Sequence, residues 1–85
     1  MFRKAEQEVI MMAYNYDKLR GAIKEHFGTQ EKFAESMGMS IPALSARLNN
    51  KSKFSQDEIV KACELFHIMP EDIASYFFTY EVQKN

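Results

Sequence analysis

The chain has 85 residues, of which 46% are hydrophobic and 27% charged, and its formal net charge is −1 at pH 7. A chain of this length forms one domain with a modest core and no deep substrate cleft beside it, which favours binding over catalysis. No apolar run approaches the roughly 20 residues that span a bilayer. No stretch has the pattern of a secretory signal, and the single cysteine, Cys63, cannot form an internal disulfide. We therefore expect a cytoplasmic protein that does not enter a membrane.

The first twelve residues differ from the rest because they predict only a weak amphipathic helix. They end in two adjacent methionines, Met11 and Met12. The residues Gln7, Glu8 and Val9 can be encoded with the purine run of a bacterial ribosome-binding site just before these methionines. We therefore expect residues 1–12 to be an N-terminal extension, with the natural product beginning at Met11 or Met12, and residues 13–85 to form a single domain.

The first helix predicted in this domain runs from about Asp17 to Phe27. Leu19, Ile23 and Phe27 recur at i, i+4 and i+8, so they form one apolar stripe that faces the core. Asp17 is expected to cap the start of this helix, and Gly28 is expected to end it.

A second helix is predicted between Thr29, a good N-cap, and Gly38, a good C-terminal stop. Phe33 and Met37 continue the inward face. Ala34 lies where two helix backbones can approach each other closely.

A third helix is predicted from Ser40, which is a good N-cap. Pro42 falls in its first turn, where a missing N–H costs nothing and the fixed φ favours the helix. Leu44 and Leu48 are four residues apart and face inward, which leaves an outward face that is small and polar. Residues 49–53 then have the composition of a loop.

The fourth predicted helix begins after Ser55, because Ser55 and Glu58 have the spacing of a capping box. It is expected to end near His67. The apolar residues at helical spacing along it are Ile59, Ala62, Cys63 and Phe66.

Pro70 opens a short fifth helix that is predicted to continue to about Ser75, after which the apolar period changes to two. The alternation from Tyr76 to Gln83 predicts a short C-terminal β-strand. A lone strand in a helical domain either pairs with its copy in a homodimer or closes the core as an extended tail. The residues expected to form the dimer contact are Phe78, Tyr80 and Val82.

Charge is distributed unevenly along the domain. Residues 13–53 carry seven bases and four acids, a charge of +3, whereas residues 54–85 carry two bases and six acids, a charge of −4. No acid occurs between Ser36 and Lys53. The first part is expected to face phosphate, although an ordinary solvated surface would carry the same charges.

The second and third predicted helices have the spacing of a DNA-reading helix-turn-helix. In this motif one helix braces against the DNA backbone and the N-terminal half of the next enters the major groove. A small residue, a turn glycine and a buried leucine hold the two helices at a fixed angle, and Ala34, Gly38 and Leu44 supply them here.

Residues 17–69 resemble the Cro/C1-type helix-turn-helix domains, also called the XRE family, of phage repressors. The resemblance implies an all-α, compact five-helix bundle that binds an operator, usually as a dimer, without catalytic residues or a cofactor. Small phage-encoded Cro-like regulators of low-GC Gram-positive hosts are similar in five segments: Lys18-Leu19-Arg20-Gly21, Gly28-Thr29-Gln30, Leu48-Asn49-Asn50-Lys51, Lys61-Ala62-Cys63-Glu64-Leu65 and Tyr76-Phe77-Phe78.

The resemblance also assigns positions that contact DNA: Gln30, Ser40, Ile41, Pro42, Ser45, Asn49 and Lys51. Lys53 is expected to add a phosphate contact. Arg47 could reach a base or a phosphate, or it could lie over the edge of the core. The family often has glutamine, arginine or asparagine where this chain has Ile41, Pro42 and Ala46, which offer only apolar contact to a base.

Cys63 and His67 are four residues apart on one predicted helix, which would let them share a metal ion. Two ligands make no closed site, and no second pair is nearby. We therefore expect no metal, no cofactor, no small-molecule ligand and no enzymatic activity.

The sequence leads first to a sequence-specific DNA-binding transcriptional regulator, a phage or prophage Cro-like repressor that binds double-stranded operator DNA as a homodimer. An alternative is a protein-interaction modulator that binds a partner repressor through the apolar start of the third helix or the aromatic C-terminal strand. A third alternative is an antitoxin of the same fold, which an adjacent toxin gene would reveal.

Overall fold

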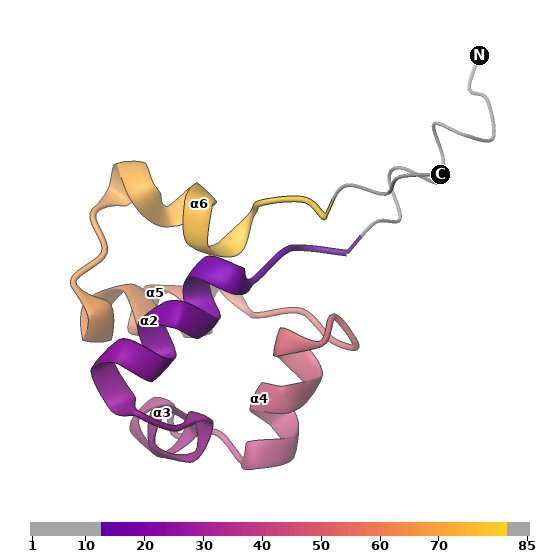
Figure 1. Cartoon of the computed structure of the whole chain (residues 1–85), viewed down its shortest axis with the longest axis vertical. Helices are drawn as coiled ribbons and strands as arrows, with labels where there is room; N and C mark the ends of the chain where they lie inside the picture. Colours follow the sequence, from indigo (N-terminus) through magenta and orange to yellow (C-terminus); the bar gives the residue numbers. More distant parts are fainter. Residues whose placement is uncertain (1–12, 82–85) are drawn as a thin grey trace, which may run out of the picture.

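The structure is a computed structural model, and it describes residues 13–81. This part of the chain is a compact bundle of five α-helices and one short 3₁₀ helix, which confirms the predicted all-α, five-helix fold. The elements in chain order are α2 (Asp17–Phe27), α3 (Gln30–Met37), α4 (Ile41–Leu48), α5 (Gln56–Phe66), η1 (Pro70–Asp72) and α6 (Ile73–Phe77). Figure 1 shows α3 and α4 at one end of the molecule and α6 at the other, with α2 passing between them. The extension predicted for residues 1–12 lies outside the described residues.

Local side-chain caps fix the starts of three helices. The Thr29 hydroxyl accepts a hydrogen bond from the backbone N–H of Lys32, and the Ser40 hydroxyl accepts one from Ala43. Ser55 and Glu58 form the predicted capping box at the start of α5. Each cap satisfies a backbone donor that the first turn of a helix leaves without a partner, so α3, α4 and α5 begin where the sequence predicts.

Helix α2 spans Asp17–Phe27 as predicted, but its cap differs from the prediction. Asp17 is the first helical residue rather than the cap, and the N-cap residue, Tyr16, makes no side-chain capping bond. The carbonyl oxygen of the Asn15 side chain accepts a hydrogen bond from the backbone N–H of Asp17 at 2.8 Å. The prediction of Asp17 as the cap is therefore wrong, because Asn15 performs this role from two residues earlier.

A single hydrophobic core lies between the helices. Phe33 is fully buried, and its ring stacks on Phe66 at a centroid distance of 5.1 Å. Phe27 contacts both of these rings, at 5.3 Å from Phe33 and 5.6 Å from Phe66. The remaining fully or nearly fully buried side chains include Leu19, Ile23, Ala34, Met37, Leu44, Leu48, Ala62 and Phe77. The apolar stripes predicted for the first four helices thus meet in this core.

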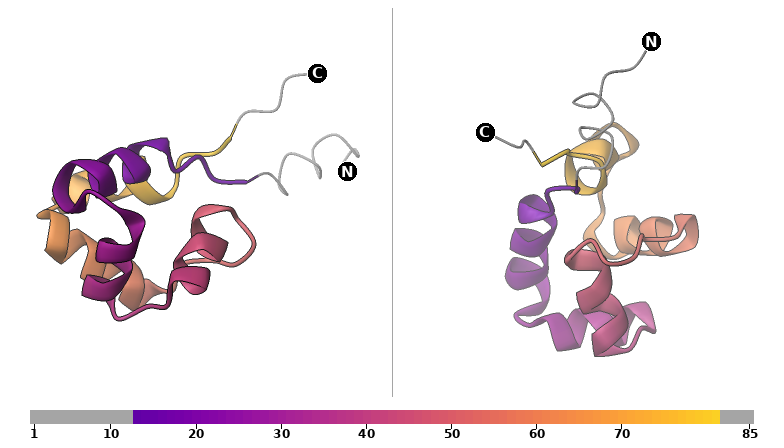
Figure 2. Two further views of the ribbon diagram at one scale, coloured as in Figure 1. Left: turned by 60° about the horizontal axis from the view of Figure 1, so that its bottom comes forward. Right: turned by 90° about the vertical axis from the view of Figure 1, so that its right-hand side faces the viewer.

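The C-terminal part corrects the predicted strand. The chain remains helical to Phe77, whose buried ring packs edge-on against Phe54 at 5.3 Å. No strand occurs in the described residues; Tyr80 forms only an isolated antiparallel bridge with Tyr14 of the same chain. The segments before α2 and after α6 therefore run side by side, as Figures 1 and 2 show. Val82, the third residue of the predicted dimer contact, lies outside the described residues.

The bridge near the two ends of the domain is tied to the loop after α4. The side-chain oxygen of Asn50 accepts a hydrogen bond from the backbone N–H of Tyr14 at 2.8 Å, and its amide nitrogen donates one to the Tyr14 carbonyl at 3.0 Å. Asn50 has a φ of 64°, a left-handed conformation that asparagine tolerates better than most residues. The loop that follows α4 is thus fixed against the segment that precedes α2.

Candidate recognition surface on α4

The second helix of the predicted motif, α4, is held by its inner face. Leu44 and Leu48 are buried, and so is Ala34 in the middle of α3. Gly38 ends α3 with a φ of 74°, a conformation that glycine adopts without steric cost. The backbone N–H of Met39 then donates to the Ala34 carbonyl at 2.9 Å. This packing fixes which face of α4 is exposed.

The exposed start of α4 is apolar. Ile41 is 49% exposed although it is a large hydrophobic residue, and Pro42 beside it is also exposed. Ser40 is exposed as well, but its hydroxyl is engaged as the helix cap. Ala46 is half-buried one turn further along. The start of this helix therefore offers mainly apolar contact, and its side chains carry no charge.

Arg47, the one charged residue of α4, is bound within the protein. Its Nε lies 2.8 Å from Oε1 of Glu58 on α5, and its Nη2 lies 3.1 Å from Oε2, which makes a two-point ion pair. Its Nη1 donates to the Ala43 carbonyl and to the Ser52 hydroxyl, both at 3.2 Å. The sequence left open whether Arg47 faces DNA or lies over the core edge; in the structure it lies against α5.

Glu58 is held from two sides. Its Oε1 also accepts a hydrogen bond from the backbone N–H of Ser55 at 2.9 Å. Partial burial raises the pKa of Glu58, but the hydrogen bonds and charge of Arg47 and the hydrogen bonds of Ser55 outweigh burial and hold this pKa below its ordinary value of 4.5. The carboxylate is therefore charged at neutral pH and compensates the guanidinium.

Replacing Glu58 with glutamine is expected to lower the free energy of unfolding by about 1 to 2 kcal/mol at pH 7, because the charge-assisted pair with Arg47 is lost. A carboxyl whose pKa is lower in the folded than in the unfolded state stabilises the fold above its unfolded pKa, and this contribution disappears as the pH falls through the folded value. The difference between wild type and variant should therefore be complete at neutral pH and shrink below pH 4.5. Urea denaturation over a pH series measures it, and a difference that stays constant in acid would contradict the pairing.

The two polar candidates in the second half of the recognition surface are paired with each other. The side-chain amide nitrogen of Asn49 donates to the Ser45 hydroxyl at 3.2 Å. The Asn49 oxygen accepts a hydrogen bond from Nη2 of Arg20, which also donates to the Leu48 carbonyl. These internal bonds use part of the hydrogen-bonding capacity of the two side chains, while the Ser45 O–H and the second N–H of the Asn49 amide can still donate.

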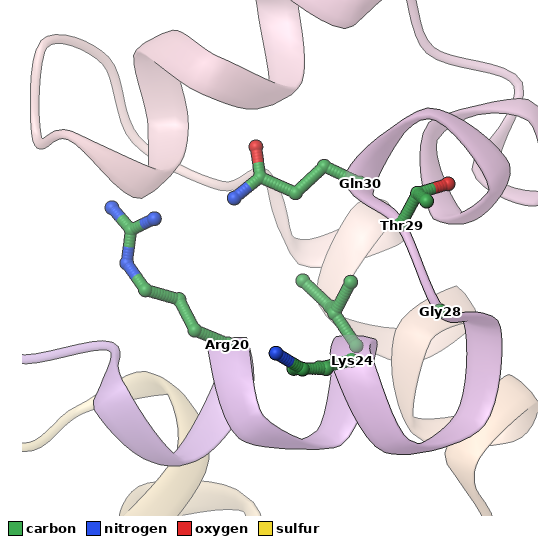
Figure 3. Close-up of a pocket in the computed structure, with 6 residues that line it drawn as sticks. Arg20, Lys24, Gly28, Thr29 and Gln30 are labelled. Carbon is green, nitrogen blue, oxygen red and sulfur yellow. The ribbon is translucent and has the colours of Figure 1, made fainter.

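The candidate residues for phosphate contact, two lysines and a glutamine, lie beside α4 rather than on it. Lys51 and Lys53 are exposed in the loop that follows the helix. Gln30 is exposed at the start of α3 and lines an open depression of about 270 Å³. Figure 3 shows Arg20 and Lys24 on α2 at one side of this depression and Gln30 at the other. These positive and amide groups are the part of the site that suits phosphate.

A second exposed apolar feature lies where the two ends of the domain meet. The ring of Tyr14 stacks on Tyr80 at 5.3 Å and meets Phe78 edge-on at 6.0 Å. Phe78 and Tyr80 remain largely exposed despite these contacts. Two of the three residues predicted for dimerisation thus form an aromatic cluster with Tyr14 of their own chain.

Cys63 and His67 take no part in a cluster of metal ligands. Residues 13–81 contain no group of three or more histidine, cysteine, aspartate or glutamate side chains that could hold an ion. Burial, together with the negative charge of Glu64, raises the pKa of the Cys63 thiol, which keeps it in the less reactive thiol form. Within the described part of the chain, no helix is both long enough and apolar enough to cross a bilayer.

Sequence reasoning missed two residues that shape this surface. From the sequence, Glu58 is only half of a capping box, and its second role as the partner of Arg47 depends on how α4 and α5 pack. The sequence likewise predicts only an ordinary loop residue at Asn50. An asparagine just after a helix is compatible with a left-handed turn, but no sequence signal identifies the Tyr14 backbone as its partner.

Two comparisons with known proteins bear on this surface. Residues 12–80 match the model of a family described as "Protein of unknown function (DUF739)". Among solved structures, the chain is similar to the solution structure of the modulator of repression (MOR) of the temperate bacteriophage TP901-1 from Lactococcus lactis. The two sequences are 43% identical, the match covers 85% of this chain and 97% of that chain, and the TM-score is 0.71. No curated protein sequence matches the chain.

Proposed function

The chain belongs to the DUF739 family, and we propose that it is a phage or prophage regulator that modulates repression by binding a partner repressor protein. The observation that carries this proposal is the likeness to the phage modulator of repression, at 43% identity over 85% of the chain. That likeness also covers 97% of the modulator chain.

The composition of α4 supports a protein partner. Protein interfaces have cores that are depleted of charged residues and rich in apolar contact. The start of α4 offers the exposed side chains of Ile41 and Pro42, while the charge of Arg47 is compensated by Glu58. A helix that reads the major groove uses donors and acceptors, and here Ser45 and Asn49 are already paired with each other.

The aromatic cluster of Tyr14, Phe78 and Tyr80 is a second surface on which a partner could bind. Tyrosine is over-represented among residues that dominate binding energy, because its ring buries a large area at low entropic cost. The cluster is tied by Asn50 to the loop that follows α4. A single partner could therefore contact both the loop and the aromatic rings.

Operator binding remains the second candidate, because Gln30 and Lys51 are exposed at positions that meet the DNA backbone in the Cro/C1-type domains that the chain resembles, and Lys53 is exposed two residues after Lys51. In that case a homodimer would place two α4 helices in successive major grooves, about 34 Å apart. This candidate requires base contacts from Ser45, Asn49 or the apolar start of α4. An antitoxin role would use the same fold and requires a toxin encoded beside it.

The experiment that tests the proposal uses the repressor encoded by the same phage and a DNA fragment that carries its operator. Mobility shifts are recorded for the repressor alone, for this chain alone, and for the two together. The proposal predicts that this chain alone gives no operator-specific shift, that it changes the shift given by the repressor, and that calorimetry detects a complex without DNA. A specific shift by this chain alone, with no complex in calorimetry, would favour the operator-binding candidate.

A further inference from the structure

We propose that Glu58 determines the class of partner that α4 accepts, because its ion pair with Arg47 withholds the one charged side chain of this helix from DNA phosphates. The inference rests on the proposed function, since it gives a physical reason why a helix-turn-helix scaffold would select a protein over a duplex. It assigns Glu58 a role in specificity in addition to its role in the capping box.

The guanidinium of Arg47 lies beside the loop that carries Lys51 and Lys53, so its charge would add to theirs if Glu58 did not compensate it. Nη1 of Arg47 lies 3.2 Å from the hydroxyl of Ser52, which stands between Lys51 and Lys53 in the chain. Both lysines are exposed. Without a carboxylate beside it, the charge of Arg47 would join these two lysines in one cationic cluster at the edge of α4. Clusters of this kind attract the DNA backbone irrespective of its sequence.

The ion pair between Arg47 and Glu58 has a two-point geometry that fixes both side chains. Both oxygens of Glu58 accept from Arg47, at 2.8 and 3.1 Å, and the two side chains are only 21% and 23% exposed. Two-point pairs between arginine and carboxylate are stronger and geometrically more specific than single contacts. The carboxylate is fixed in turn by the Ser55 backbone N–H in the first turn of α5, where the helix dipole favours negative charge. Both residues are therefore held in place before any partner arrives.

Glu64 provides a matched control. It lies on the same helix and is exposed, and its replacement by glutamine changes the net charge by the same amount as Glu58→Gln. Only the change at Glu58 removes the charge opposite Arg47. The general effect on DNA binding of losing one negative charge should therefore be the same in both variants. Only Glu58→Gln should also release Arg47.

The experiment measures binding of random-sequence duplex DNA by fluorescence anisotropy at a series of salt concentrations, with wild type, Glu58→Gln and Glu64→Gln. One additional phosphate contact steepens the slope of log K against log salt by about 0.9 and strengthens binding about tenfold at low salt. We expect this change for Glu58→Gln and less than half of it for Glu64→Gln. The double variant Arg47→Met, Glu58→Gln should return to the wild-type level, because it has the net charge of the wild type and lacks the side chain that was released.

Circular dichroism on the same samples identifies a variant that has unfolded, and Glu58→Gln keeps an oxygen that can accept the Ser55 N–H. Equal DNA binding by Glu58→Gln and Glu64→Gln would overturn the inference. A gain in DNA binding that persists without Arg47 would also overturn it. These outcomes are distinct from failure of the proposed function, which would appear as a wild-type protein that forms no complex with the repressor.

Discussion

Replacing Phe33 with alanine is expected to lower the free energy of unfolding by about 3 to 5 kcal/mol, enough to leave a domain of this size largely unfolded. Phe33 is 0% exposed, and its ring lies 5.1 Å from Phe66 and 5.3 Å from Phe27. Alanine would remove the apolar area and leave a cavity at the point where α2, α3 and α5 meet. Urea denaturation followed by circular dichroism measures the change.

Phe78→Ala is the matched control for this experiment, because it deletes the same ring from an exposed position. Its ring contacts Tyr14 alone among the aromatic pairs of the described residues. We expect a loss of at most about 1 kcal/mol for Phe78→Ala. Similar losses in the two variants would show that the ring cluster around Phe33 does not carry the stability of the fold.

Helices α2 to α5 could be predicted from sequence because their boundaries are set by local chemistry. Ser55 and Glu58 interact within one turn, and Gly38 ends α3 through its own backbone freedom. Neither signal depends on what packs against the helix. Their apolar stripes then place residues such as Leu44 in the core from periodicity alone.

The C-terminal strand was predicted wrongly because the contact that decides its conformation is not local in sequence. The alternation from Tyr76 onward has the period of a strand, but burial of Phe77 against Phe54 favours two further helical residues. The packing energy of a buried aromatic ring exceeds the small differences in backbone propensity that the pattern reports. The contact depends on residues 23 positions apart in the sequence, so no window along the chain contains it.

The sequence predicts which face of α4 is exposed, but it does not predict that the charge of Arg47 is compensated. Periodicity gives the exposed face of α4 and therefore identifies Ile41 correctly as an exposed residue. The state of Arg47 depends on Glu58, which is eleven residues away and on another helix. Counting bases along the chain treats Arg47 as free charge, whereas the structure shows it compensated. The surface of α4 is for this reason less suited to phosphate than the composition of residues 13–53 implies.

Replacing Ile41 with glutamate is expected to weaken the complex with the repressor by about 30- to 1,000-fold, which corresponds to about 2 to 4 kcal/mol. If the exposed side chain of Ile41 is buried by the partner, a carboxylate in its place would lose its hydration without gaining a counter-charge. The fold should be unaffected, because Ile41 is the first residue of α4 and a negative charge there is favoured by the helix dipole. Calorimetric titration of the repressor with each variant measures the loss.

Val60→Glu introduces the same carboxylate at another exposed apolar residue, on α5. Val60 is 56% exposed, against 49% for Ile41, so the two changes differ mainly in which helix carries them. We expect Val60→Glu to leave repressor affinity within about threefold of wild type, as is typical of surface positions outside a binding site. Equal weakening by both variants would mean that the apolar start of α4 is not the contact, and it would move the repressor-binding surface to another part of the domain. Loss at Ile41 alone would identify α4 as the helix that binds the repressor, through apolar contact in place of base recognition.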